Sequence, residues 1–290
     1  MTWKVIAAIG IAGFAAIGAS PAYPTERVQF ESARYLVGPL QQRLARERGE
    51  TVARPPVEII SGYLTKPEGP GPFPAIVHLH GCGGLPKAFK AGTDKGFWSE
   101  KLIEWGYVVL VVDSFTTRGI EQACTTAGKG VASRIGDAYG ALAYLSTLPF
   151  IDANRIGILG FSQGAIAALA VVRRREYELF ENEADRKFKA VVAFYPSCSD
   201  DGTMTVPALI LIGELDDWTP AAGCKHMMAS RSGAGSPVRL IVYPGAHHGF
   251  DAMALRPGRE LFGHRIEYNE SAAHQASEDV RRFLAEQLGR

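Results

Sequence analysis

Residues 155–172, RIGILGFSQGAIAALAVV, decide the fold of this chain because they predict a strand, a tight turn and a helix in immediate succession. The apolar run 155–159 is typical of a buried strand, and the alanine-rich run 165–172 is typical of a buried helix. Residues 160–164, GFSQG, place Ser162 on a sharp bend whose glycines let strand and helix approach closely. This pentapeptide is a weak motif alone, so its interpretation depends on the segments later in the chain.

Two later loops carry the groups that would activate Ser162 as a nucleophile. The strand predicted at 206–213 is followed by an acidic turn, and the strand predicted at 238–243 leads into residues 244–250, PGAHHGF. A nucleophilic serine needs a base and a carboxylate that orients the base, and after such a bend they follow in the order Ser, Asp, His. Both loops follow the carboxyl ends of strands, so we expect them at the same end of the sheet as Ser162.

The orienting acid is predicted to be Asp216, with Asp217 as its rival and Glu214 as a more distant alternative. Asp216 lies one tight turn beyond the strand, from where its carboxylate can reach inward. Asp217 is instead expected to cap a helix that opens near Thr219 and Pro220, because proline is favoured at the first helical position.

The general base is predicted to be His248, with His247 as the alternative. Gly249 permits the backbone bend that would turn the imidazole toward the nucleophile. The remaining histidines of the second half are expected in helices or polar loops at the surface: His226, His264 and His274.

Residues 78–84, HLHGCGG, allow two interpretations. His78 and His80 share one face of a strand and would suit a zinc ion together with the later histidine pair. The favoured interpretation is a strand end and glycine loop that supplies a backbone N–H to an oxyanion hole. We predict the amides of Cys82 and Gln163 as the two donors. The alternatives to Cys82 are Gly81 and Gly83.

Composition and element order predict one α/β domain with a mostly parallel central sheet and helices on both faces. Strands and helices alternate from about residue 57 onward, as in doubly covered sheets. A chain of 290 residues with 47% hydrophobic residues can fill one large core. The net charge of +1 gives no footprint for nucleic-acid binding.

The first 22 residues predict a signal peptide. Lys4 gives a short basic start, residues 5–18 are apolar, and residues 19–22 (ASPA) suit cleavage after Ala22. The apolar run is short for a membrane span, although an uncleaved anchor or a buried helix are alternatives. We therefore expect a periplasmic or secreted protein without a stable membrane span, whose single domain covers 23–290.

Five segments together resemble the dienelactone hydrolase family within the α/β-hydrolase superfamily, over roughly residues 57–288. The resemblance implies the α/β-hydrolase fold and a Ser162–His248–Asp216 triad. Founding members of the family use cysteine where this chain has Ser162, and serine shifts the expectation toward general ester or lactone hydrolysis. The segments are 80–84 (HGCGG), 134–137 (RIGD), 160–164 (GFSQG), 213–216 (GELD) and 243–250 (YPGAHHGF).

Arg118 lies where this family places an arginine that binds a substrate carboxylate. The resemblance therefore implies a substrate contact for Arg118. Its alternative is a solvated loop residue or a partner of a local acid, such as Glu121.

Four cysteines fit an oxidising compartment. Each lies just after a predicted strand or in the loop and helix that follow it. In a hydrolase-type sheet these strands should be neighbours in two pairs, so the preferred disulfides are Cys82–Cys124 and Cys198–Cys224. Free buried thiols are the alternative.

The sequence thus predicts an enzyme that transfers the acyl group of a small-molecule ester or lactone to water, with no metal or organic cofactor. Three alternatives are a non-catalytic binding protein on the same fold, a zinc hydrolase and a peptidase. A missing triad member would favour the binding protein, and none is missing.

Overall fold

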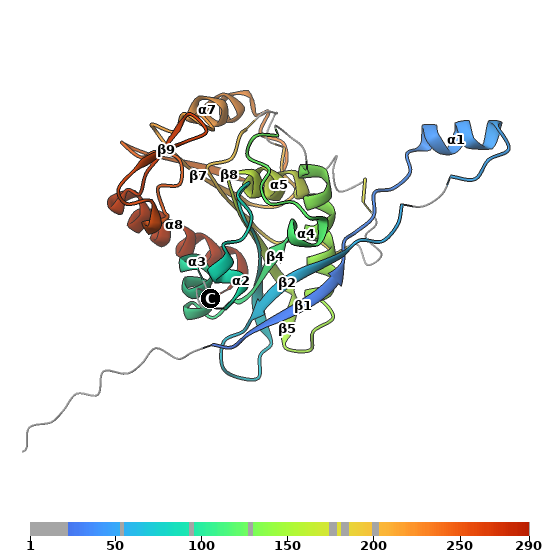
Figure 1. The fold of residues 1–290 in the computed structure, drawn as a ribbon, viewed down its shortest axis with the longest axis horizontal. Helices are drawn as coiled ribbons and strands as arrows, with labels where there is room; N and C mark the ends of the chain where they lie inside the picture. Colours follow the sequence, from blue (N-terminus) through green and yellow to red (C-terminus); the bar gives the residue numbers. More distant parts are fainter. Residues whose placement is uncertain are drawn as a thin grey trace, which may run out of the picture.

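The computed structural model describes residues 23–52, 55–92, 96–126, 130–173, 179–180, 186–198 and 203–289. Its centre is an eight-stranded sheet in the order β1-β2-β4-β3-β5-β6-β7-β8 (Figure 1). From β4 to β8 the neighbours pair in parallel, whereas β1 and β2 form an antiparallel edge. The strands are β1 (Thr25–Glu31), β2 (Ile59–Thr65), β3 (Phe73–Leu79), β4 (Val108–Asp113), β5 (Ile151–Phe161), β6 (Val191–Phe194), β7 (Ala208–Gly213) and β8 (Val238–Tyr243).

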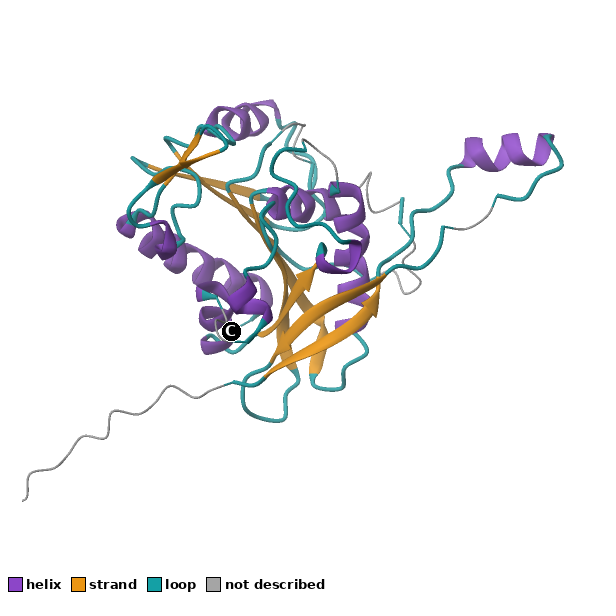
Figure 2. Ribbon diagram, in the orientation of Figure 1, coloured by secondary structure: helices purple, strands orange, loops and turns teal. Residues whose placement is uncertain are grey.

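Helices cover both faces of the sheet, which confirms the predicted fold class (Figure 2). α4 (Val131–Leu145) and α5 (Gln163–Val171) lie together on one face, and α3 (Phe97–Glu104) and α8 (Glu270–Leu288) lie on the other. Every residue of the central strands β4 (VVLVVD) and β7 (ALILIG) is buried, as expected for parallel strands covered on both sides. Further elements are α2 (Lys87–Lys90), α7 (Ala221–Ser230) and the hairpin of β9 (Arg259–Leu261) and β10 (His264–Ile266).

The helix α8 is capped at its start and buries one face in the core. Asn269 precedes it and accepts a hydrogen bond from the amide of Ala272 at 3.0 Å, which caps the helix. The residues of its core face include Ala276, Val280, Phe283 and Leu284, which are all buried. Within the described ranges, no helix has both the length and the apolar character that a membrane crossing requires.

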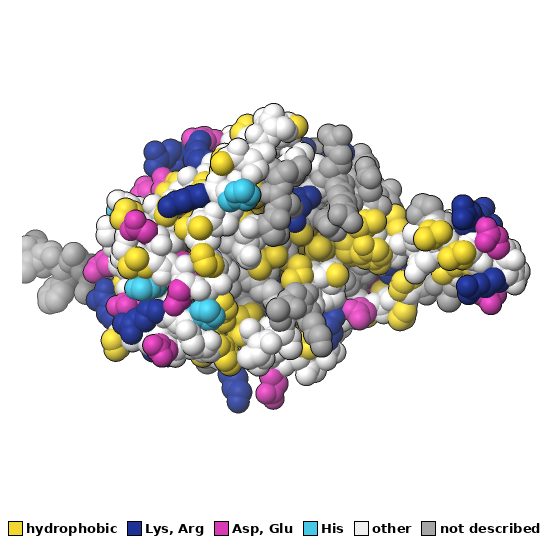
Figure 3. Space-filling view, turned by 90° about the horizontal axis from the view of Figure 1, so that it is seen from above, with side chains coloured by type: hydrophobic (Ala, Val, Ile, Leu, Met, Phe, Trp, Pro, Cys, Tyr) yellow, Lys and Arg dark blue, Asp and Glu magenta, His cyan; other side chains and the backbone are white. Residues whose placement is uncertain are grey.

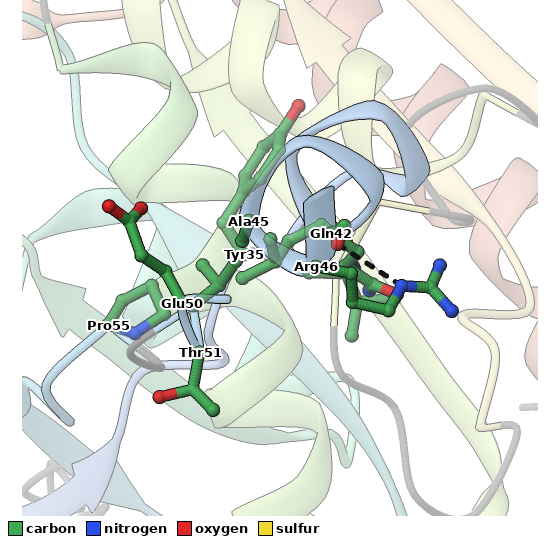
Figure 4. Close-up of a pocket in the computed structure, with 10 residues that line it drawn as sticks. Tyr35, Gln42, Ala45, Arg46, Glu50, Thr51 and Pro55 are labelled. Atoms are coloured by element: carbon green, nitrogen blue, oxygen red, sulfur yellow. Dashed lines mark hydrogen bonds between the residues drawn. The ribbon is translucent and has the colours of Figure 1, made fainter. Parts of the chain in front are cut away.

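The connection between β1 and β2 contains a helix that the sequence analysis did not predict, α1 (Pro39–Glu47). Figure 1 shows α1 standing away from the sheet, and Leu40 and Leu44 are exposed. Hydrophobic side chains gather along this arm and at its root (Figure 3). A hollow of about 470 Å³ lies beside α1 and is lined by residues of the arm, including Tyr35 and Gln42 (Figure 4).

Two disulfides join neighbouring segments and confirm the predicted pairing. Cys82 is bonded to Cys124, and Cys198 to Cys224. The strands that precede these cysteines are adjacent in the sheet: β3 pairs with β4, and β6 pairs with β7. The prediction succeeded because it rested on strand neighbours rather than on cysteine spacing.

Candidate active site

Ser162 occupies the predicted bend between β5 and α5, with φ 50° and ψ −118°. This conformation is costly for a residue with a side chain, and the surrounding contacts enforce it. A Cβ atom at Gly160 would lie 2.3 Å from the carbonyl oxygen of Gly164, and one at Gly164 would lie 2.4 Å from that of His80. Both positions therefore require glycine, which explains the glycine two residues on either side of Ser162.

The structure brings Ser162, His248 and Asp216 together. Ser162 Oγ is 3.1 Å from His248 Nε2, and His248 Nδ1 is 2.9 Å from Asp216 Oδ2. A carboxylate only accepts hydrogen bonds, so His248 Nδ1–H donates to Asp216 and leaves Nε2 to accept from the serine hydroxyl. Each residue follows the carboxyl end of a different strand: β5, β8 and β7.

Asp216 is held by the turn that follows it. Its Oδ1 accepts hydrogen bonds from the amides of Trp218 at 3.0 Å and Thr219 at 2.8 Å. The Thr219 hydroxyl is 3.1 Å from Asp216 Oδ2 and 3.2 Å from His248 Nδ1. These bonds fix the carboxylate toward the imidazole, and the sequence analysis did not identify Thr219 as part of the site.

The rivals of Asp216 lie elsewhere, and the predicted cap by Asp217 is wrong. Pro220 precedes α7 without a side-chain cap, whereas Asp217 Oδ2 accepts from the amide of Arg265 at 3.3 Å. Asp217 is also 3.6 Å from His264 Nδ1 in the strand β10, so His264 is not in a helix or polar loop as predicted. Glu214 accepts from the backbone of the next loop.

A second buried carboxyl group, Asp251, lies behind the histidine. The indole N–H of Trp98 donates to Asp251 Oδ2 at 2.7 Å, and the Tyr195 hydroxyl interacts with the same carboxyl. The Tyr195 ring packs on the His248 ring with centroids 4.5 Å apart. Burial raises the pKa of Asp251, against the effect of the Trp98 hydrogen bond. In the sequence, the one indication that Asp251 belongs to the site is its position directly after residues 244–250, PGAHHGF.

The glycine loop after β3 lies against the nucleophile. A Cβ atom at Gly81 would be 3.8 Å from the Ser162 Cβ. Cys82 is anchored by its disulfide and by its carbonyl, which accepts from the amide of Ala123 at 2.8 Å. Within the described residues, the amides of Cys82 and Gln163 donate no hydrogen bond.

His78 lies in β3 and is half-buried, whereas His80 follows β3 and is buried, and the pKa of each imidazole lies below its usual value. His80 Nδ1 lies 2.7 Å from the Gly81 carbonyl oxygen, and burial holds the pKa of His80 well below its usual value, with the charge of Arg134 acting in the same direction. Among the described residues, no group of three or more His, Cys, Asp or Glu side chains is arranged to hold a metal ion. The zinc-site interpretation therefore has no geometric support.

The aromatic side chains near the site differ in how deeply they are buried. Phe115 and Phe161 are buried in the core. Trp218 is half-buried, and its ring lies 5.1 Å from that of His248 and stacks on His264 at 5.0 Å. Of these three aromatic residues, Trp218 is therefore the one that is partly exposed beside the His248 ring.

Arg118 is engaged with two acids, and the structure does not favour a substrate contact. Its Nε donates to Glu58, Nη1 donates to Ser114 O and Asp137 Oδ2, and Nη2 donates to Asp137 Oδ1 and Glu58. These bonds use all five donors of the guanidinium, and Glu121 is not among the partners. The physical reason is that α4 presents the buried carboxylate of Asp137 to the loop after β4.

A parallel sheet covered on both faces, with serine on the bend after β5 and acid and histidine after later strands, defines a hydrolase of the α/β class. The family model described as "Dienelactone hydrolase family" matches residues 60–288. The chain belongs to the dienelactone hydrolase family and is a carboxylic ester hydrolase, as the sequence resemblance implies.

The similar proteins are distant in sequence but extend over most of the chain. A Synechocystis sp. protein named "Putative carboxymethylenebutenolidase" is 20% identical over 254 residues, which are 79% of this chain and 92% of that protein. A dienelactone hydrolase structure from Anabaena variabilis has a TM-score of 0.57 at 19% identity, covering 80% of this chain and 93% of that one. A thermophilic esterase from Thermogutta terrifontis also has a TM-score of 0.57 at 19% identity, covering 78% and 87%.

Proposed function

We propose that this protein is an exported serine hydrolase in which Ser162 attacks the carbonyl carbon of a small ester or lactone. The observation that carries the proposal is the hydrogen-bonded chain from Ser162 through His248 to Asp216, with separations of 3.1 and 2.9 Å. These distances are within the range expected between a nucleophile, its base and the group that orients the base.

In the proposed reaction, His248 Nε2 takes the serine proton as Ser162 Oγ bonds to the carbonyl carbon. Asp216 stabilises the imidazolium, and the amides of Cys82 and Gln163 receive the negative charge that develops on the carbonyl oxygen. His248 then protonates the departing alkoxide, which leaves an acyl group on Ser162. Water adds to this acyl group with His248 again as base, and the acid product departs as Ser162 regains its proton.

The identity of the nucleophile and the name of one relative support the proposed substrate class. Serine in place of the cysteine of founding family members supports general ester hydrolysis, and the name of the Synechocystis relative denotes a lactone hydrolase. Arg118 has no free donor for a substrate carboxylate, so we do not propose a preference for anionic esters through it. The predicted leader at 1–22 lies outside the described residues, and two disulfides are compatible with an oxidising destination.

The test is a turnover screen with p-nitrophenyl esters of graded chain length beside a panel of lactones. We expect hydrolysis of at least one short ester or lactone by the unaltered protein and its loss in Ser162→Ala, with activity retained in excess chelator. Equal hydrolysis by both proteins would overturn the proposal.

A further inference from the structure

Arg134 is a fully buried, charged residue that takes no direct part in the proposed reaction. It lies on α4 with no exposed surface. Within the described residues, no carboxylate oxygen lies within 4 Å of its guanidinium, and its Nε has no partner. Burial lowers the pKa of Arg134 to about 10, so the group stays charged at neutral pH. A buried charge without a paired carboxylate destabilises a fold, which calls for a compensating role.

The guanidinium joins the two segments that flank Ser162. Nη1 donates to Gln163 Oε1 at 3.1 Å, and Nη2 donates to the carbonyl oxygen of His80. Arg134 Cζ lies over the Phe115 ring, 5.2 Å from its centre, which restricts the movement of the guanidinium. One side chain on α4 therefore connects the end of β3 to the first residue of α5.

These two partners adjoin the proposed oxyanion donors. Gln163 supplies one donor from its own backbone, and His80 precedes the other donor, Cys82, by two residues. We propose that Arg134 is a positioning residue that holds both amides of the oxyanion hole at a fixed separation and adds a positive potential behind them. This inference rests on the proposed function. Charge on the substrate oxygen is then stabilised more in the transition state than in the ground state.

The nearest acid on the same helix, Asp137, acts on the charge of Arg134, and the positive charge of Arg118 acts against it. Asp137 lies three residues along α4, but both of its carboxylate oxygens accept from Arg118, at 2.8 Å each. Asp137 Oδ1 also accepts from the Ser32 hydroxyl at 2.7 Å. The negative charge of Asp137 is thus paired with Arg118, whereas the guanidinium of Arg134 contacts the segments on either side of Ser162.

The test compares Arg134→Met and Arg134→Lys with the unaltered enzyme on an ester that it hydrolyses. Lysine keeps the charge but lacks the planar fork needed to reach both partners. We expect kcat to fall about 30- to 300-fold in Arg134→Met and less in Arg134→Lys, with KM within threefold, since removal of an oxyanion donor itself costs about 100- to 1000-fold. The affinity for benzeneboronic acid, which forms a tetrahedral adduct on Ser162, should fall in parallel with kcat.

The matched control is Arg155→Met, which removes a partly exposed arginine near the opposite end of β5 that pairs with Asp152. It should leave kcat and boronate affinity unchanged. If Arg134→Met does not fold, Gln163→Met removes the acceptor and keeps the backbone amide, and it should lower kcat at least tenfold.

Two failures are distinguishable. Absence of Ser162-dependent turnover in the unaltered protein would overturn the proposed function itself. Ser162-dependent turnover with unchanged kcat and boronate affinity in folded Arg134→Met, or in Gln163→Met where that variant replaces it, would overturn the positioning role alone. A rise in KM without a fall in kcat would also contradict it, because it would indicate ground-state binding.

Discussion

At the scale of single residues, Ser162 depends on geometry that its neighbours impose. Its φ of 50° is unfavourable for serine, and the backbone is held by the Ser162 amide, which donates to the Phe194 carbonyl at 2.9 Å. The bend turns the hydroxyl toward His248 rather than into the sheet. The strained residue is thus the one from which the proposed chemistry starts.

Asp216 and Asp217 are adjacent carboxylates, and the proposed mechanism predicts that substituting them changes kcat to very different extents. Asp216→Asn should lower kcat by about 1000-fold or more, because an amide in this position favours the wrong tautomer of His248. Asp217→Asn should change kcat less than threefold, since Asp217 contacts β10 and not the imidazole. Steady-state kinetics on one ester would measure both, and the reverse ranking would show that the acid was misassigned.

Arg118 is expected to matter for stability rather than for binding. Arg118→Met leaves the buried carboxylate of Asp137 without its bidentate partner, so the free energy of unfolding should fall by about 3 kcal/mol. Urea denaturation would measure this change. The kcat/KM values for a neutral ester and for its anionic hemi-ester should keep the same ratio, and a selective rise in KM for the hemi-ester would restore the substrate role.

At the scale of elements, the sequence predicted the pieces with strong local patterns and missed those set by tertiary contact. The continuous apolar run of β7 was identified because both of its faces are buried. The helix α1 was missed because it is polar and packs little of its length on the core. β1 begins at Thr25, three residues before its first buried residue, Val28, because antiparallel pairing with β2 extends it.

The strand β3 carries a pH-sensitive residue. Burial lowers the pKa of His78 to about 4, with the charge of Arg134 acting in the same direction. Between pH 6.5 and 4 the unfolded chain binds a proton at His78 and the folded chain does not, so acid lowers the stability of the fold. Relative to His78→Asn, the unaltered protein should lose about 1–2 kcal/mol of unfolding free energy between pH 7 and pH 5. Urea titrations at both pH values would measure this, and a constant difference would contradict it.

The residues of the site likewise divide into those that lie in strong local sequence patterns and those that are set by tertiary contacts. Ser162, Asp216 and His248 could be named from sequence because each follows a strand in a recognisable local segment. The partners of Asp251 and Arg134 could not be named, since Trp98 lies 153 residues from Asp251 and His80 lies 54 residues from Arg134. A lone arginine among the apolar residues of a buried helix was the available indication for Arg134.

At the scale of the whole molecule, we expect the exported protein to lack its leader and to contain both disulfides. Intact-mass measurement of the secreted protein should find an N-terminus at Tyr23, because the predicted leader ends at Ala22. All four cysteines should resist alkylation, since they form two disulfides. Four alkylatable thiols in the native protein, or a mature chain that keeps residues 1–22, would contradict the proposed destination.

The proposed function requires that one serine among all those in the chain is activated for attack on carbonyl carbon. A fluorophosphonate probe, followed by peptide mass spectrometry, tests this requirement without choosing a substrate, because only an activated hydroxyl attacks phosphorus at neutral pH. We predict a single adduct per molecule on Ser162, formed within minutes, and no adduct in Ser162→Ala or in protein denatured before labelling. An unlabelled Ser162, or labelling that persists in Ser162→Ala, would contradict the serine mechanism.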